Sequence, residues 1–299
     1  MENSTEQTRR WLKGIPYEVA FWRSYYSSRK RRKRLFEWSL YGKPCSLDNF
    51  DIQTFVRSLT AEADEPLILD VGCALSYMFG NIFDGREVKI DYIDPLAMFY
   101  NRILDDFSID RPRIRFGMIE QLSASYAPDS ADFIHIRNAL DHCADPMTGI
   151  LQALTVAKTG GIVYLNHHRD EAVREAYRGF HQYNITEEAG KLVIWNRHTR
   201  IDVAEALKNF AEVECSVTKD DFIVAVIRKT GPVSRSLCSP ESTAVSAMDI
   251  LQATVCHFHS FPASASYQLS RLVTTAGHRT MRLIPFSWVK AIKRLLKRV

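Results

Sequence analysis

Residues 67–76 constrain the fold of this chain more than any other segment of ten. They begin as an apolar run that carries a single acid, Asp70, and they break at Gly72 into a turn containing Ala74 and Ser76. An apolar strand that ends in a turn of small residues is typical of a buried parallel strand that delivers its backbone to a ligand. The segment therefore predicts a strand of a parallel α/β sheet with a binding site at its carboxyl end.

A second apolar strand, residues 88–94, ends on Asp94, which lies 22 positions after Gly72. An acid at about this distance from the glycine turn is well placed to hydrogen-bond the two hydroxyls of a ribose. A dinucleotide would also need a phosphate cradle of the Gly-x-Gly-x-x-Gly type, and Ala74 and Ser76 interrupt that pattern. The two strands therefore indicate a cofactor that contains a nucleoside but no pyrophosphate.

Apolar and helical segments alternate from residue 66 to residue 229. Such alternation predicts βαβ units in a doubly wound, mostly parallel seven-stranded α/β sheet. A short apolar segment within the insertion 167–200 predicts an extra strand at 191–195. Strands are expected near 67–71, 88–93, 113–116, 132–136, 161–166, 211–218 and 221–228, and helices near 46–60, 74–83, 95–107, 120–125, 146–157 and 201–209.

Charge divides the chain into three parts. Residues 1–44 hold 11 Lys and Arg against 4 Asp and Glu, residues 230–299 hold 9 against 2, and the segment between them is acidic. We expect a helical, basic N-terminal extension at 1–60, the α/β domain at 61–230, and a linker with basic amphipathic helices at 231–299. An acidic centre with basic ends does not fit a general nucleic-acid binder and favours a catalytic domain whose flanks contact something anionic.

The turn after the first strand, Asp-x-Gly-x-Ala-x-Ser, resembles a relaxed motif I of class I S-adenosylmethionine-dependent methyltransferases. Residues 117–122 and 132–142 resemble the later motifs of that family, and the resemblance covers about residues 66–228. It implies a Rossmann-like methyltransferase fold and S-adenosylmethionine as cofactor. Where the family often has an aspartate that binds the adenine, this chain has Met118, which we expect to pack on the adenine face. The implied cofactor-binding residues are Asp70, Gly72, Ala74, Ser76, Asp94, Pro95, Met118, Ile119 and Asn138.

Three further segments, 138–142, 166–172 and 177–184, resemble methyltransferase-domain proteins of bacterial polysaccharide and glycan biosynthesis. This resemblance implies a carbohydrate acceptor and O-methylation of a sugar hydroxyl. The residue types agree, because aromatic faces stack on sugar rings while amides and imidazoles hydrogen-bond hydroxyls. The expected substrate-binding residues are His167, Tyr177, His181, Gln182, Asn184 and Trp195.

Methyl transfer to a hydroxyl requires a base that removes the proton, and a neutral histidine suits that task near pH 7. His168 and His142 both follow expected strand ends, so either is the predicted base, with Asp141 or Glu171 as orienting partner. A metal site is also open, because His167, His168, Asp170 and His181 are all metal-ligand types, but their spacing matches no standard motif and no metal ligand is assigned.

Other readings of the chain remain open. A catalytically inactive, methyltransferase-like scaffold or binding module of a glycan-assembly complex is favoured by the degenerate motif I and the missing adenine aspartate. A nicotinamide enzyme is disfavoured because the pyrophosphate cradle is absent. The basic run 29–34 suits an RNA methyltransferase, but the acidic centre and the absence of an Asn/Asp-Pro-Pro-Tyr/Phe motif count against nucleic acid as a partner.

The chain is expected to be cytoplasmic. It has no run of eighteen apolar residues and no secretion signal, and its six cysteines contain no Cys-x-x-Cys pair and are expected to be reduced. Residues 286–299 alternate apolar and basic positions with helical spacing, which predicts an amphipathic helix. Such a helix would dock on an anionic membrane surface at the inner face, pack on the α/β domain, or join two copies in a homo-oligomer.

Overall fold

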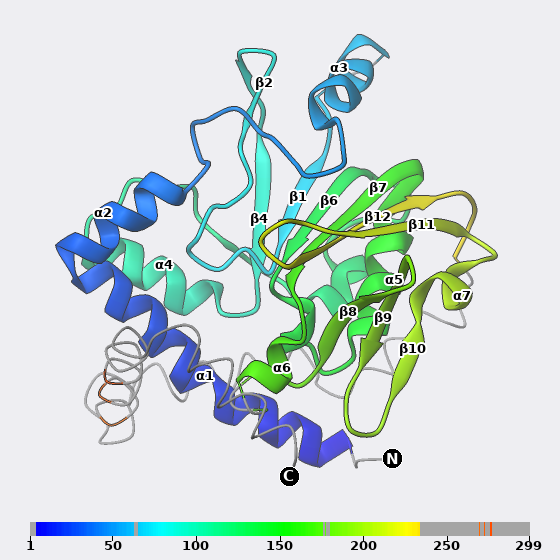
Figure 1. Cartoon of the computed structure of the whole chain (residues 1–299). Helices are drawn as coiled ribbons and strands as arrows, with labels where there is room; N and C mark the ends of the chain where they lie inside the picture. The colour runs from blue at the N-terminus through cyan, green and yellow to red at the C-terminus, as the bar shows by residue number, and fades with distance from the viewer. Residues whose placement is uncertain are drawn as a thin grey trace.

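The computed structural model describes residues 4–62, 65–175, 177 and 180–233, together with the single positions 269, 272 and 276. Its centre is a seven-stranded sheet in the order β11-β12-β7-β6-β1-β4-β5 (Figure 1). The strands of this sheet are β1 (Ile68–Val71), β4 (Ile90–Asp94), β5 (Arg115–Phe116), β6 (Ala131–Arg137), β7 (Ala157–His168), β11 (Ala211–Val217) and β12 (Phe222–Lys229).

The five strands β5, β4, β1, β6 and β7 run parallel, while β12 is antiparallel to β7 and β11 is antiparallel to β12. Both faces of the sheet are covered, so β1 is buried along its whole length, and β4 and β6 are buried at all but one residue each. The predicted doubly wound, mostly parallel seven-stranded sheet is confirmed, including the reversed hairpin that closes it.

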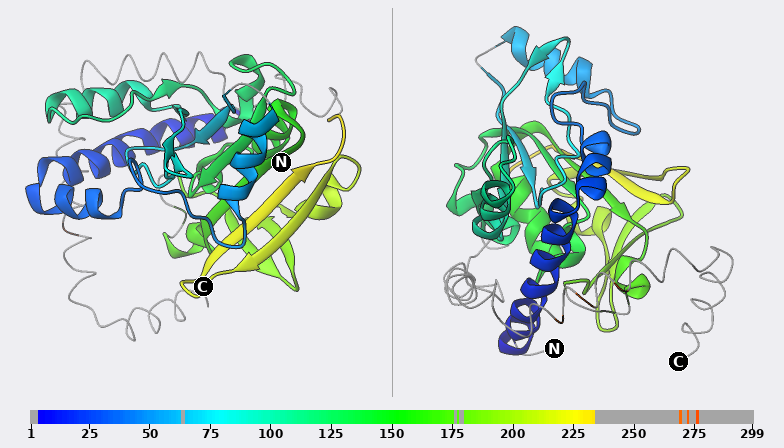
Figure 2. Two further views of the ribbon diagram at one scale, coloured as in Figure 1. Left: turned by 90° about the horizontal axis from the view of Figure 1, so that it is seen from above. Right: turned by 90° about the vertical axis from the view of Figure 1, so that its left-hand side faces the viewer.

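Helices cover both faces of this sheet (Figure 2). One hydrophobic cluster joins it to α1 (Ser4–Ser27), α2 (Arg29–Trp38), α3 (Ile52–Glu62) and α4 (Ala97–Asp106). A second cluster on the opposite face contains α5 (Pro146–Val156), α7 (Val203–Leu207) and the short 3₁₀ segments η1 (Ile119–Ala124) and η2 (Leu140–His142). The ends of β1, β4, β6 and β7 share one edge of the sheet, and the site lies there.

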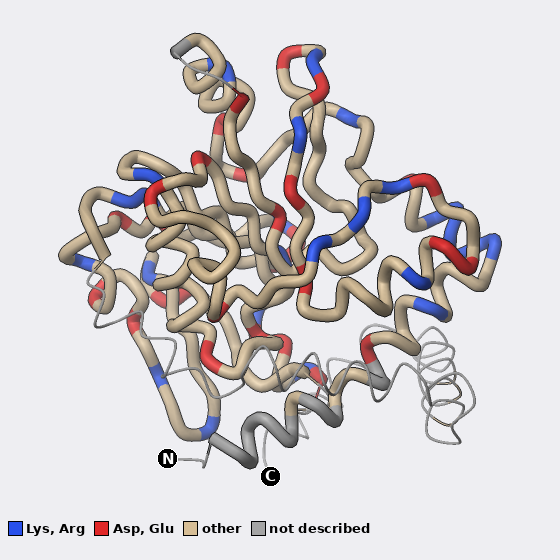
Figure 3. Tube along the Cα trace, turned by 180° about the vertical axis from the view of Figure 1, so that it is seen from behind, with Lys and Arg blue, Asp and Glu red and all other residues tan. Residues whose placement is uncertain are grey.

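The expected helices in the N-terminal extension are present as α1 and α2. Ser28 separates them and caps α2, because its side chain accepts a hydrogen bond from the backbone N–H of Arg31. Ile15, Val19 and Tyr26 are buried against the sheet, so α1 packs into the same core as the strands. Lys and Arg gather at the end of the molecule where α2 lies (Figure 3).

The segment after β1 is not a helix, so the prediction for 74–83 is wrong. Ala74 and Tyr77 adopt φ values of 46° and 48°, which are left-handed and interrupt a right-handed helix. The segment instead inserts Phe79 into the core, where its ring stacks on those of Phe133 and His135. Aromatic packing therefore determines this crossover, and helical propensity does not.

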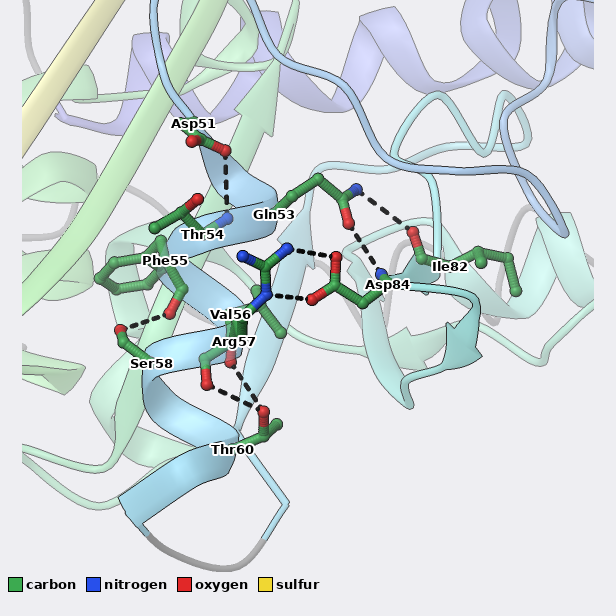
Figure 4. A network of polar contacts seen from close by, with 10 residues as sticks. All are labelled: Asp51, Gln53, Thr54, Phe55, Val56, Arg57, Ser58, Thr60, Ile82 and Asp84. Atoms are coloured by element: carbon green, nitrogen blue, oxygen red, sulfur yellow. Dashed lines mark hydrogen bonds and ion pairs between the residues drawn. The ribbon is translucent and has the colours of Figure 1, made fainter.

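Two short strands, β2 (Ile82–Phe83) and β3 (Arg86–Glu87), follow that segment and form a hairpin that α3 holds in place (Figure 4). Gln53 accepts a hydrogen bond from the backbone N–H of Asp84, and its amide donates to the carbonyl of Ile82 at 3.4 Å. Arg57 pairs with the carboxylate of Asp84 through two nitrogens. α3 begins at Ile52, later than the expected start at 46.

The insertion 167–200 contains α6 (Glu171–Arg174) and a three-stranded antiparallel sheet, in the order β10-β9-β8. The predicted strand at 191–195 is confirmed as β9 (Lys191–Trp195), and it pairs with β8 (Asn184–Glu188) and β10 (Arg200–Asp202). Because β10 occupies residues 200–202, α7 starts two residues later than the expected helix at 201–209.

No helix among the described residues is both long and apolar enough to cross a membrane. The four cysteines that the structure describes, Cys45, Cys73, Cys143 and Cys215, are free thiols. The predicted helix at 286–299 and nearly all of the segment 231–299, for which a linker and amphipathic helices were expected, lie outside the described residues.

Candidate functional site

The turn after β1 is set by Gly72. This residue has φ +70°, and a Cβ placed on it would lie 2.3 Å from the Cβ of Ala139 in the loop after β6. Its backbone N–H donates to the carbonyl of Ile93 on the neighbouring strand at 2.8 Å. Only glycine combines this backbone conformation with this close approach, so the two loops at the edge of the sheet meet here.

Asp94, at the end of β4, faces this turn. One carboxylate oxygen accepts the backbone N–H of Ala74 at 3.1 Å, and the other accepts that of Leu96 at 2.8 Å. The residue is buried, with 5% of its surface exposed. Burial raises the pKa of Asp94 to about 7, and the two backbone hydrogen bonds oppose only part of that rise.

A charge carried by helix α1 also acts on this carboxylate. The carboxylate of Glu18 accepts a 2.7 Å hydrogen bond from the indole of Trp22 and acts electrostatically on Asp94. The Trp22 ring meets Tyr100 of α4 edge-on, with 6.4 Å between ring centroids. The residues predicted to contact the adenine, Met118 and Ile119, are buried as well, while Gly72, Ala74, Ser76, Pro95 and Asn138 are partly exposed.

Two of the predicted cofactor residues have structural partners within the protein. Asp70 is buried and shares a 2.8 Å hydrogen bond with Nδ1 of His135 on the neighbouring strand β6. The side-chain amide oxygen of Asn138 accepts a hydrogen bond from the backbone N–H of His168 at 2.8 Å, and the backbone N–H of Asn138 donates to the carbonyl of Asn166. Asp70 therefore braces β1 against β6, and Asn138 fixes the end of β7.

A second group of side chains, which we term the Asp141 cluster, consists of Asp141, His142 and His181. Asp141 Oδ2 lies 2.7 Å from Nδ1 of His181 and 3.4 Å from Nε2 of His142, and the two ring nitrogens are 3.2 Å apart. Asp141 and His142 come from η2, and His181 from the segment before β8. The backbone N–H of Gln182 donates to the carbonyl of Asp141 and holds the two segments together.

The three residues of the Asp141 cluster and their burial shift one another's pKa values. Burial would raise the pKa of Asp141, but the charges of His142 and His181 outweigh it and hold that pKa well below its usual range. Burial lowers the pKa of His142. Burial acts in the same direction on His181, but the hydrogen bond with Asp141 raises its pKa to about 9. Nearby, burial raises the pKa of Glu171 to about 7.

Two further histidines end β7. His167 is 1% exposed, and neither ring nitrogen has a hydrogen-bond partner among the described residues. Burial lowers its pKa to about 3. His168 is half-buried with its ring against Phe222, and burial lowers its pKa to about 4. Both rings are therefore neutral at pH 7.

The predicted substrate residues fall into two groups. His167 and His181 lie near Asp141, and each interacts with it electrostatically. The others are farther along the insertion: Asn184, fully buried, accepts the N–H of Val173 and donates to the hydroxyl of Tyr177, and Trp195 donates its indole N–H to Asp170. Gln182 contributes its backbone N–H to the Asp141 cluster.

Sequence reasoning missed several contacts that shape the site. It named Asp141 and His181 separately but not their pairing, which spans 40 positions. It also missed the hydrogen bond from the indole of Trp11 to the carbonyl of His142, which spans 131 positions. No spacing rule relates residues so far apart in the chain, so these contacts could not be predicted from the sequence.

No protein-family model matches this chain, and no curated protein matches it. Among solved structures, it resembles the YcgJ protein from Bacillus subtilis at 15% identity, covering 60% of this chain and 99% of that one, with a TM-score of 0.32. A SAM-dependent methyltransferase from Aquifex aeolicus matches at 12% identity, 67% and 98% coverage and a TM-score of 0.36. The T. thermophilus 16S rRNA N2 G1207 methyltransferase, solved with AdoMet and guanosine, matches at 13% identity, 64% and 42% coverage and a TM-score of 0.35. Likenesses at this level concern the fold alone.

Proposed function

We propose that this protein is an S-adenosylmethionine-dependent methyltransferase. The observation that carries the proposal is the position of Asp94. Its two oxygens each accept one backbone N–H, from Ala74 and Leu96, and each keeps a further acceptor position. A buried carboxylate with one position left on each oxygen fits the two neighbouring hydroxyls of a ribose.

The neighbouring residues at this edge of the sheet agree with that cofactor. The Gly72 turn offers backbone groups and little side-chain bulk where a methionine tail would lie, and Met118 and Ile119 offer an apolar wall for an adenine.

When bound, S-adenosylmethionine supplies an electrophilic methyl group, so the protein has to align the acceptor and remove its proton. Of the two predicted bases, we favour His168. Its ring is neutral at pH 7, is partly exposed and makes no hydrogen bond with any described residue, while Asn138 holds its backbone in place. His142 is instead engaged in the Asp141 cluster.

We propose a hydroxyl of a sugar as the acceptor. Support comes from the polar and aromatic side chains of the insertion, which follow the ends of β6 and β7. His181 is partly exposed beside Asp141, and Trp195 and Tyr177 are half-buried aromatic residues with polar partners. Residues of this kind bind sugars by stacking and by hydrogen bonds.

Calorimetric titration with S-adenosylmethionine and S-adenosylhomocysteine tests the cofactor. Wild type should bind both, and Asp94→Asn should weaken binding about 100-fold, because hydrogen bonds to a charged group contribute about 1.5–3 kcal/mol each. Asp105→Asn, at an exposed aspartate of α4, is the matched control and should bind as wild type does. If wild type binds neither compound, the inactive scaffold is the better account.

Transfer of labelled methyl from S-adenosylmethionine to a panel of sugars tests the base. His168→Ala should lower the rate by about 100-fold or more while leaving cofactor affinity unchanged. His142→Ala serves as the comparison. Full activity of His168→Ala would remove this residue from the mechanism, and full activity of both variants would exclude a histidine base at either position.

A further inference from the structure

We propose that Asp141, His142 and His181 form a binding site for a divalent cation of the Zn²⁺ class. Each residue offers one ligand atom, and the three atoms lie within 4.8 Å of one another. The proposal goes beyond the methyltransferase function, because it concerns three side chains that the predicted cofactor does not contact. The sequence did not predict this site, because the spacing of positions 141, 142 and 181 matches no standard metal-binding motif.

The dimensions of the triangle suit such a cation. Its sides are 2.7, 3.2 and 3.4 Å, which corresponds to a circumradius of about 1.8 Å. A point about 2.0 Å from all three atoms therefore exists, and 2.0–2.2 Å is the usual length of Zn–N and Zn–O bonds. Two of the three sides are close to the ligand separation of about 3.3 Å in a tetrahedron with such bonds.

The protein backbone holds the three ligands in place. The carbonyl of Asp141 accepts hydrogen bonds from the N–H groups of Gln182 and Tyr183, so η2 and the segment carrying His181 cannot separate freely. The indole of Trp11 donates to the carbonyl of His142 at 2.9 Å. The site is thus built from main-chain contacts that do not depend on the ligand side chains themselves, which limits the movement needed on binding.

The local charge favours a cation. Asp141 is buried, and its Oδ1 has no hydrogen-bond partner among the residues that the structure describes. The carboxylate in contact with His181 is that of Asp141, and the negative charges of Glu171 and Glu18 also act on this imidazole. The side chains of His142 and His181 are partly exposed, at 23% and 25%, which leaves a route from solvent. A bound cation would displace the proton that His181 holds beside Asp141 and would take over its compensation of the buried carboxylate.

The donor set selects the class of cation. Two imidazoles and one carboxylate suit Zn²⁺, Co²⁺ and related transition metals, whereas Mg²⁺ and Ca²⁺ prefer oxygen ligands. Three protein ligands leave a fourth position of a tetrahedron for a water or for an oxygen of a substrate. The alternative is a metal-free arrangement in which Asp141 and the two histidines share protons.

The test uses untagged, full-length protein dialysed against a chelator, without S-adenosylmethionine. Titration with Zn²⁺ should show one equivalent bound, and Co²⁺ should give the visible absorption bands of a tetrahedral complex. Asp141→Asn and His181→Gln should each weaken Zn²⁺ binding at least about 100-fold. Circular dichroism and thermal unfolding of the metal-free variants check that they remain folded.

His198→Gln is the matched control, because this exposed histidine of the same insertion lies outside the Asp141 cluster. It should bind Zn²⁺ as wild type does. Absence of stoichiometric binding by wild type, equal binding by Asp141→Asn, or a Co²⁺–thiolate charge-transfer band that points to cysteine ligands would each overturn the proposal. Because no cofactor is present, these outcomes are independent of whether the protein binds S-adenosylmethionine.

Discussion

Two buried aspartates stand at the same edge of the sheet, and their surroundings differ. Asp94 ends β4, and its described hydrogen bonds come from the backbone amides of Ala74 and Leu96. Asp141 lies beyond β6, and its Oδ2 meets His181 and His142 while its Oδ1 has no partner among the described residues. Both side chains are almost fully buried.

Their pKa values move in opposite directions although burial is the largest cause for both. Burial raises the pKa of Asp94 to about 7, because two neutral amides do not compensate the lost hydration. The charges of His142 and His181 hold the pKa of Asp141 below its usual range despite its burial. The comparison teaches that Asp94 needs outside donors to be a stable carboxylate, whereas Asp141 is already ionised by its neighbours.

The largest expected effect comes from Gly72→Ala. Gly72 lies where the loop after β1, which contacts Asp94, meets the loop after β6, which leads to Asp141. A methyl group there would meet the Cβ of Ala139 at 2.3 Å, and φ is +70°. Overpacking and backbone strain together should lower the free energy of unfolding by about 3 kcal/mol. Since Ala139 precedes Asp141 in the same loop, affinities for S-adenosylmethionine and for Zn²⁺ should both fall. Urea unfolding and calorimetry measure these changes.

Two variants separate strain from overpacking. The double variant Gly72→Ala/Ala139→Gly removes the clash and should retain a loss of only about 1–2 kcal/mol from the backbone conformation. Gly160→Ala, at φ +83° with no heavy atom near its added Cβ, should show the conformational loss alone. If Gly72→Ala is no more destabilising than Gly160→Ala, the loops do not meet as closely as the structure indicates.

The sheet could be predicted well because each of its strands is recognisable from its local sequence. Apolar runs between turn residues located all seven strands, and the alternation with helices predicted their parallel order. The helix expected at 74–83 failed for a physical reason. Residues such as Leu75 and Tyr77 permit a helix, but the burial of Tyr77 and Phe79 in the core overrides that local preference.

The candidate site, too, has one part that could be predicted from the sequence and one part that could not. The proximity of Asp94 to the Gly72 turn was predictable because the ends of neighbouring parallel strands meet at one edge of the sheet, and their role in cofactor binding stays a prediction. The pairing of Asp141 with His181 was not, because the insertion between them folds back through the three-stranded sheet β10-β9-β8. Residue type indicated polar chemistry at 181, but only the fold shows which partner that chemistry has.

The pH dependence of cofactor affinity sharpens the comparison. In the free protein the pKa of Asp94 is about 7, raised by burial and further by the carboxylates of Glu18 and Asp70. Ribose hydroxyls donate best to the ionised form, so affinity should rise about tenfold per pH unit up to about 7 and level off above it. Calorimetry at pH 5.5, 6.5, 7.5 and 8.5 measures this, and a flat profile would contradict it.

The raised pKa of Asp94 also makes the free energy of unfolding depend on pH. The folded protein binds the proton of Asp94 more tightly than the unfolded chain, whose aspartate pKa is about 4. The contribution of Asp94 to the free energy of unfolding should therefore decline as pH rises from about 4 to about 7. Asp94→Asn lacks this decline, so its stability relative to wild type should improve across that range.

The smallest effect is expected for Trp11→Phe, which acts on one side of the site only. The substitution removes the indole hydrogen bond to the carbonyl of His142. It keeps an aromatic ring that can stack on Phe180, whose ring centroid lies 4.7 Å from that of Trp11 in the wild-type structure. Loss of one hydrogen bond should cost about 1 kcal/mol of stability and loosen His142, weakening Zn²⁺ binding about fivefold. S-adenosylmethionine affinity should stay within about twofold, because Asp94 gains and loses no contact. An equal loss of both affinities would show that α1 controls the whole edge of the sheet as one unit, and the distinction between Asp94 and Asp141 would then be one of charge and not of mechanical support.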